Sequence, residues 1–168
     1  DRIFFDTNLD YSGLRMISPI FDSINNEYPV QIEYKPYHRD SYKVIFHPQV
    51  LKQYNNRWFT IGFSEGSDFD YEILALDRIN SISKEDGEYK DLNIDWEEYF
   101  EDIVGVSRNR NDKAKEIEFK VKANTAPYIE SKPIHQSQKK KKVEDDWITF
   151  SINVIWNKEL EMLFNSYG

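Results

Sequence analysis

The sequence contains no cysteine among its 168 residues. This absence excludes disulfide bonds, thiolate metal sites and a cysteine nucleophile, and it favours a cytoplasmic location. Glycine is also scarce, and none of the six glycines belongs to a phosphate-binding loop or a nucleophile elbow. The three histidines do not have the spacing of metal ligands. We therefore expect no metal, no cofactor and no enzymatic activity.

Basic residues and long apolar runs are lacking too. Lysine and arginine total 22 against 30 acidic residues, which gives a formal net charge of −8. Non-specific binding to duplex DNA requires many phosphate contacts from basic side chains, so we expect this chain not to bind a duplex by itself. No apolar run approaches the ~20 residues that span a bilayer, and no signal peptide is recognisable, so we expect no membrane partner.

The first half of the chain has the pattern of one helix followed by short strands. Apolar residues at helical spacing between Leu14 and Ile24 predict a helix that begins near Ser18. Alternating apolar and polar residues then predict strands, separated by turn-forming residues, over 30–34, 42–47, 57–63, 71–76 and 79–82. Pro48 is expected to interrupt the second strand, because proline cannot donate to a ladder. Several short strands at this spacing indicate a small barrel or a strongly bent sheet.

The second half predicts a different set of elements. Asp95, with Glu98 three residues later, has the signature of a helix start, and a helical stripe follows up to Ile103. Residues 109–112 are polar and indicate a linker. Beyond them the periodicity predicts a strand at 117–121, a helix over 125–132, strands from 134 and over 147–155, and a final helix over 160–167. This β-α-β-β-α order is typical of an α+β sandwich.

One basic run stands out, Lys139–Lys142. We interpret it as an exposed hairpin or edge strand, in which lysines discourage pairing with other strands. A phosphate contact is the alternative. It is less favoured because three acidic residues, Glu144, Asp145 and Asp146, follow at once.

Three segments of the first half stand out by their order and spacing: His47-Pro48-Gln49-Val50-Leu51, Arg57-Trp58-Phe59-Thr60-Ile61-Gly62 and Leu76-Asp77-Arg78-Ile79. In this order and spacing they resemble the WYL-domain family of bacterial transcription regulators. In that family a proline-leucine segment precedes a Trp-Tyr-Leu strand, and a Leu-Asp-Arg-Ile strand closes the unit. Here the triplet that names the family reads Trp58-Phe59-Thr60. Without the resemblance, the same residues predict the core of a barrel.

The resemblance implies an α+β fold: a small SH3-like (Sm-like) β-barrel with an entry helix, followed by a ferredoxin-like β-α-β-β-α domain. It divides the chain into a linker at 1–13, a WYL-like barrel domain at 14–90, a connecting helix and linker at 91–113 and a C-terminal extension at 114–168. Family members usually carry a winged helix-turn-helix N-terminal to these parts. None is recognisable here, and the chain begins at Asp1 instead of Met, so we expect it to be part of a longer regulator.

The resemblance also implies a ligand. The family's barrel is expected to bind an anionic effector, a nucleotide or short single-stranded nucleic acid, through basic and aromatic side chains. Arg78 matches a ligand position of the family, whereas Val44 and Glu72 stand where arginines are expected. The residues that we expect to contact the effector are Arg78, His47, Lys43 and Arg57, with Trp58 or Phe59 as a stacking surface. The competing role for Arg78 is an ion pair with Asp77 or another carboxylate.

These observations together predict the ligand-sensing and dimerising part of a bacterial transcription regulator. It would contact duplex DNA only through a domain outside this chain. We expect a homodimer, because the stripe of Trp96, Tyr99, Phe100 and Ile103 leaves apolar surface for a partner. The alternative is an interaction module that dimerises the regulator without any small ligand. A hydrolytic enzyme is a distant third.

Overall fold

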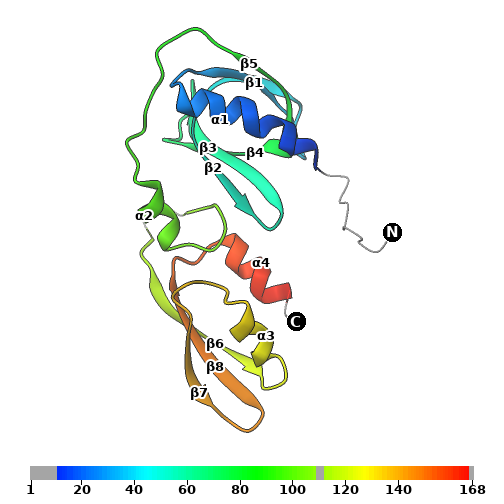
Figure 1. The fold of residues 1–168 in the computed structure, drawn as a ribbon, viewed down its shortest axis with the longest axis vertical. Helices are drawn as coiled ribbons and strands as arrows, with labels where there is room; N and C mark the ends of the chain where they lie inside the picture. Colours follow the sequence, from blue (N-terminus) through cyan, green and yellow to red (C-terminus); the bar gives the residue numbers. More distant parts are fainter. Residues whose placement is uncertain (1–10, 109–111, 167–168) are drawn as a thin grey trace, which may run out of the picture. The chain divides into compact units, whose positions relative to one another are not determined.

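The computed structural model describes residues 11–108 and 112–166, and the chain divides into two compact units. Unit 1 ends at Ile94 and unit 2 begins at Asp95 (Figure 1). Residues 1–10 of the expected linker over 1–13 lie outside the described residues. Residues 109–111 of the second expected linker do so as well. Over the described residues, no helix is long and apolar enough to cross a membrane.

Unit 1 is a five-stranded antiparallel sheet preceded by a helix. Its elements, in chain order, are η1 (Tyr11–Met16), α1 (Ile17–Asn25), β1 (Val30–Tyr34), β2 (Tyr42–Tyr54), β3 (Arg57–Ser64), β4 (Glu72–Ala75), η2 (Leu76–Arg78) and β5 (Ile79–Lys84). The strands lie in the order β4-β3-β2-β1-β5, so the short 3-10 helix η2 joins the two edge strands. The predicted helix and the five predicted strands are all present, and β2 is longer than predicted. Closure of the sheet into an SH3-like barrel stays a prediction.

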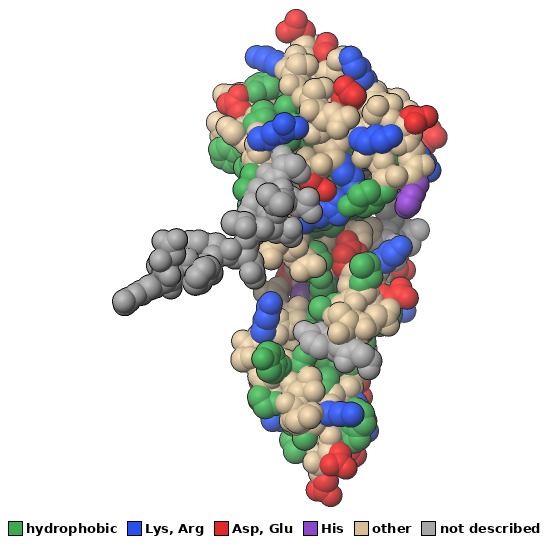
Figure 2. Space-filling view, turned by 90° about the vertical axis from the view of Figure 1, so that its right-hand side faces the viewer, with side chains coloured by type: hydrophobic (Ala, Val, Ile, Leu, Met, Phe, Trp, Pro, Cys, Tyr) green, Lys and Arg blue, Asp and Glu red, His purple; other side chains and the backbone are tan. Residues whose placement is uncertain are grey.

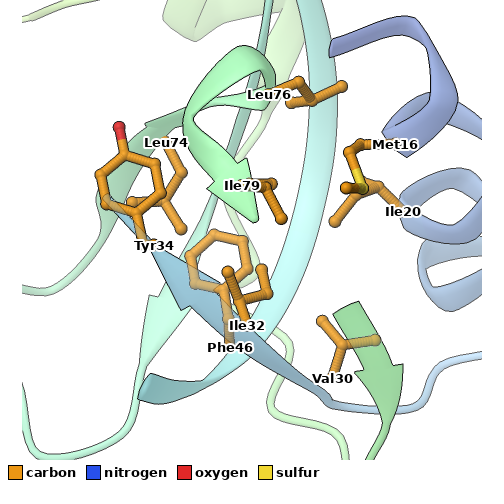
Figure 3. Packing of buried hydrophobic residues seen from close by; sticks show 9 residues of the cluster. All are labelled: Met16, Ile20, Val30, Ile32, Tyr34, Phe46, Leu74, Leu76 and Ile79. Atoms are coloured by element: carbon orange, nitrogen blue, oxygen red, sulfur yellow. The ribbon is translucent and has the colours of Figure 1, made fainter. Parts of the chain in front are cut away.

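The core of unit 1 is apolar and lies between the N-terminal helices and the sheet (Figure 3). Alternate residues of β1 point into it, because successive side chains of a strand face opposite ways. The buried side chains of this cluster are Met16, Ile20, Val30, Ile32, Tyr34, Phe46, Leu74, Leu76 and Ile79. Burial of each large apolar side chain contributes about 1.5–3 kcal/mol, so the cluster is a main source of stability for unit 1.

Strand β2 differs from its prediction, because it continues through Pro48 to Tyr54. Its pairing with β3 shifts register just after Pro48, and this β-bulge leaves Gln49 without a partner in the ladder. Gly62 lies opposite the proline, and a Cβ there would meet the His47 carbonyl oxygen at 2.2 Å. A bulge tolerates the missing proline N–H, so Pro48 distorts the strand without ending it.

Unit 2 contains a three-stranded antiparallel sheet with the strand order β6-β8-β7. Its elements are α2 (Trp96–Glu101), β6 (Lys115–Lys122), α3 (Ala126–Ser131), β7 (Lys139–Val143), β8 (Trp147–Val154) and α4 (Lys158–Ser166). As predicted, Asp95 caps α2, where its carboxylate accepts the N–H groups of Glu97 and Glu98. The predicted β-α-β-β-α order is confirmed. A ferredoxin-like arrangement stays a prediction, and Tyr167, the expected end of the last helix, lies outside the described residues.

One predicted strand of unit 2 begins later than expected. It was predicted from Ile134, but β7 starts at Lys139. Residues 134–138 form a turn, in which the Ile134 N–H donates to the side-chain oxygen of Gln138 and the Gln138 N–H donates to the carbonyl of His135, both at 3.0 Å. These local bonds satisfy the backbone without a ladder, so Ile134 reaches the apolar cluster of unit 2 from a turn.

Candidate functional site

Two arginines of unit 1, one at the start of β3 and one at the end of η2, meet at the ring of Tyr37. The guanidinium carbon of Arg78 lies 3.6 Å from the ring centroid, and that of Arg57 lies 5.7 Å from it. Tyr37 belongs to the loop between β1 and β2 and is 68 % exposed. A hydrogen bond from Arg78, and then the charges of both arginines, lower the pKa of the Tyr37 hydroxyl. Two positive charges therefore converge beneath one exposed aromatic ring.

Arg57 has a carboxylate partner, Asp77 of η2. Its Nε donates to one carboxylate oxygen at 2.8 Å and its Nη2 to the other at 2.6 Å, a bidentate pair. The bond to Asp77 is also the largest of the causes that raise the pKa of Arg57. Asp77 of η2 thus holds Arg57 of β3, and the neighbouring Arg78 stacks on Tyr37.

The Nε of Arg78 is buried and has no hydrogen-bond partner among the described residues. A buried donor without a partner costs about 1–3 kcal/mol, so native proteins rarely keep one without a reason. Two threonine hydroxyls share this condition, those of Thr60 and Thr149. Arg78 differs from them because its group is charged and lies under an exposed ring.

The two expected stacking residues lie on opposite faces of β3. Trp58 packs against the hydrophobic core of unit 1. The Phe59 ring instead lies 5.7 Å from the guanidinium carbon of Arg57, because neighbouring side chains of a strand alternate between faces. We call Arg57, Arg78, Tyr37 and Phe59 the arginine site.

The other two expected contacts, Lys43 and His47, come from β2. Lys43 is exposed and is paired in the ladder with Glu33 of β1. His47 is only 2 % exposed, and both of its ring nitrogens have partners within unit 1, Glu65 at 3.3 Å and the N–H of Lys90 at 3.0 Å. The structure therefore brings Arg57, Arg78 and Phe59 together and holds His47 in the interior.

Sequence reasoning did not single out Tyr37. The residue lies in a loop without apolar periodicity, between Pro36 and His38, and no motif includes it. In the face shown in Figure 2, basic side chains are scattered among acidic ones and form no continuous patch. No group of three or more metal-ligating side chains occurs over residues 11–108 and 112–166.

Comparison with known proteins gives one family. Residues 15–83 match the family model of the WYL domain, and no curated protein matches the chain. Among solved structures the chain is similar to Proteasome accessory factor B/C (PafBC) of Arthrobacter aurescens, at 10 % identity and a TM-score of 0.44. The similarity covers 94 % of this chain and 24 % of the PafBC chain, so the chain spans about a quarter of that length. The residues that match the WYL-domain model, 15–83, include the whole arginine site.

Proposed function

We propose that this chain is the ligand-sensing part of a bacterial transcription regulator and that its WYL domain binds an anionic effector at the arginine site. The WYL match suggests a regulatory domain of a transcription regulator, without a catalytic role. The observation that carries the ligand is the buried Nε of Arg78, which lacks a hydrogen-bond partner in the described structure. A phosphate oxygen would supply that partner.

The arginine site offers both kinds of contact that a nucleotide requires. The planar guanidinium of Arg78 presents forked donors that match phosphate oxygens. Tyr37 covers this group but is itself largely exposed, so its ring can swing aside with little loss of buried surface. Tyr37 and Phe59 then provide faces on which a base stacks, a contact worth about 1–3 kcal/mol per base.

The charge of the site favours a small ligand. Asp77 neutralises Arg57 and fixes its orientation, so the net positive charge is that of Arg78. One such charge suits a nucleotide or a short single strand, whereas a long duplex requires many phosphate contacts.

For the full-length regulator we propose a cytoplasmic homodimer that contacts duplex DNA through a domain outside this chain. The support is the WYL match, taken with the family resemblance of the ordered motifs. Light scattering of the full-length protein tests the dimer, and a monomer at tens of micromolar would contradict it.

The ligand is tested by titration calorimetry with adenosine monophosphate and by fluorescence anisotropy with a short labelled oligothymidine. Arg78→Met should weaken binding about 10-fold or more, equivalent to about 1.4 kcal/mol. Its melting temperature should change little, because Nε of Arg78 has no partner and the contact that is lost is to Tyr37, which is 68 % exposed. Arg78→Lys keeps the charge without the fork and should bind with intermediate affinity.

The matched control is Arg15→Met, which removes the same charge from an exposed position of η1. It should leave both affinities unchanged. If Arg78→Met folds and binds as tightly as the unmodified chain, or if the full-length regulator binds neither probe at millimolar concentration, the arginine site is not an effector site.

A further inference from the structure

The bulge of β2 holds a second segment of unit 1, residues 89–92, which follows β5. Five hydrogen bonds join the two segments. The N–H of Lys90 donates to Nδ1 of His47 at 3.0 Å, and the N–H of Leu92 donates to Oε1 of Gln49 at 3.1 Å. Gln49 Nε2 donates to the Lys90 carbonyl at 3.0 Å, and the hydroxyl of Tyr89 donates to the Pro48 carbonyl.

In this contact the side-chain amide of Gln49 bonds to the backbone of residues 89–92 as a peptide group of a neighbouring strand would. The bulge leaves it unpaired in the ladder, and its amide offers one acceptor and one donor to the passing segment, as a peptide group would. The same amide donates to the Tyr89 hydroxyl at 2.8 Å. Burial raises the pKa of Tyr89 to about 12, so this hydroxyl keeps its proton and remains a donor to Pro48 at neutral pH.

The contact fixes the protonation of His47. Because the Lys90 N–H donates to Nδ1, that nitrogen must carry a lone pair, and the proton of the neutral ring sits on Nε2. Nε2 lies 3.3 Å from the carboxylate of Glu65. The ring is enclosed by the side chains of Phe63 and Tyr89, with centroids 5.6 and 5.9 Å away.

We propose that residues 89–92 are a proton-sensitive latch, closed on the β2 bulge while His47 is neutral and released when its Nδ1 is protonated. A proton on Nδ1 would face the Lys90 N–H, so an attractive contact would become a repulsive one. The Lys90 ammonium, which lies 3.6 Å from the Phe63 ring centroid, adds a second positive charge nearby. Glu65 would still accept from Nε2, so the protonated ring keeps a partner after the segment leaves.

The direction of the pH effect follows from the acceptor role of Nδ1. A proton on Nδ1 removes the acceptor that the Lys90 N–H uses, so the latch is closed at high pH and opens as the pH falls. The charged and titratable groups facing the ring are Glu65 from the end of β3, and Tyr89 and Lys90 from the latch itself.

Opening of the latch lengthens the free chain that leads to Asp95, the first residue of unit 2. With the latch closed, the last held residue is Leu92 and unit 2 begins at Asp95, a span of at most about 10 Å for extended chain. Upstream of the latch, the Glu85 N–H is bonded to the Pro29 carbonyl. With the latch open, the free chain from Glu85 onward reaches at most about 35 Å. Protonation thus sets the length of free chain that precedes Asp95.

The experiment is amide hydrogen exchange by NMR on the whole chain, expressed as protection factors at several pH values. At neutral pH the amides of Lys90 and Leu92 should be protected. Gln49→Ala removes one latch contact from each of them and should lower both protection factors at least 10-fold. The β3 amides should keep their protection, which shows that the sheet is intact. Gln53→Ala, an exposed glutamine of the same strand, is the matched control and should change nothing.

Protonation is tested separately with His47→Asn, which keeps an acceptor near the position of Nδ1 but does not titrate. In the unmodified chain, the Lys90 protection factor should fall in step with the titration of the His47 ring, followed by its ring ¹⁵N shifts. In His47→Asn it should stay constant over that range. Unprotected Lys90 and Leu92 amides at neutral pH, or no effect of Gln49→Ala, would overturn the latch. A Lys90 protection factor that ignores the ring titration would overturn its proton sensitivity.

Discussion

In unit 1 the guanidinium of Arg78 stacks 3.6 Å from Tyr37 while its buried Nε has no hydrogen-bond partner, whereas in unit 2 the lysines around β7 are held by carboxylates. The ion pairs of unit 2 span 2.6–2.9 Å and are Lys140–Glu130, Lys141–Glu116, Lys142–Glu144 and Lys120–Glu144. Unit 2 therefore satisfies these charges internally, and unit 1 leaves a charged donor available.

This difference shows that the most visible charge pattern of the sequence, the lysine run, need not mark a binding site. The lysine run is the most visible charge feature of the sequence, yet β7 is an exposed edge strand on which lysines discourage pairing with other strands. Exposed ion pairs of this kind contribute little stability and leave little charge for a ligand. Arg78 belongs to no run of charge in the sequence. The motif resemblance points to it, and its surroundings in the fold mark its Nε as available.

The largest expected effect tests whether the two units are separate in stability as well as in structure. In Gly62→Ala the new Cβ would meet the His47 carbonyl oxygen at 2.2 Å, a backbone atom that cannot easily move. We expect a loss of about 3 kcal/mol of unfolding free energy in unit 1. Hydrogen exchange should show unit 1 amides losing protection while those of unit 2 keep theirs.

The control for this substitution is Gly66→Ala. Gly66 has a φ of +74°, but nothing lies within 4 Å of a Cβ there, so only backbone strain remains, about 1 kcal/mol. If the amides of both units lose protection together in Gly62→Ala, the units unfold as one and the comparison between them concerns charge alone.

A smaller effect is expected where each unit loses one carboxylate. Asp77→Ala leaves Arg57, which is 31 % exposed, without its bidentate partner and should cost about 1–2 kcal/mol, since solvent offsets part of the loss. Glu116→Ala breaks the exposed pair with Lys141 and should leave stability unchanged within error. Urea denaturation measures both variants. Equal losses would show that the two kinds of ion pair are equivalent.

A weaker effect concerns pH. Hydrogen bonds from Lys142 and Lys120 lower the pKa of Glu144 from its ordinary value of 4.5 to about 2. A lowered pKa in the folded state gives stability that is present above pH 4.5 and is lost as the pH falls towards about 2. In this window the melting temperature should fall less steeply in Glu144→Gln than in the unmodified chain, and added salt should reduce the difference. Asp145→Asn, in the same turn, should melt like the unmodified chain.

The last prediction is that the chain does not bind duplex DNA. Three of the four lysines of β7 have acidic partners, and the chain carries a net charge of −8. We therefore expect no sequence-independent binding to duplex DNA at physiological salt. Anisotropy with a labelled duplex measures this, and micromolar affinity would mean that the ion pairs of unit 2 yield to phosphate.

Much of the fold could be predicted from periodicity, because an apolar stripe on a helix or alternate residues of a strand must be buried. This holds for α1, the strands of unit 1 and the element order of unit 2. The prediction was wrong at Pro48 and Ile134, where a bulge opposite Gly62 and a turn closed by Gln138 replace regular pairing. Both depend on individual hydrogen bonds and close contacts, which leave no periodic signal.

The arginine site could be predicted only in part. The family resemblance pointed to Arg78, Arg57 and Phe59, which the structure brings together. Tyr37 could not be predicted this way, because it lies in a loop outside the motifs. Its contact with Arg78 exists only in the folded chain. The structural role of His47 could not be predicted, because its partner, the N–H of Lys90, lies 43 positions away along the chain.

The pairing of β5 with β1 has a consequence for how the chain is made. β1 is the first strand of unit 1 to be synthesised and β5 the last, yet they lie side by side. During synthesis, β1 can pair with β2 at once, but its other edge stays open until β5 has left the ribosome. An open edge is a template for strands of other chains. A chain that ends before Lys84 should therefore aggregate, and slow translation would be harmful until β5 has left the ribosome and harmless afterwards.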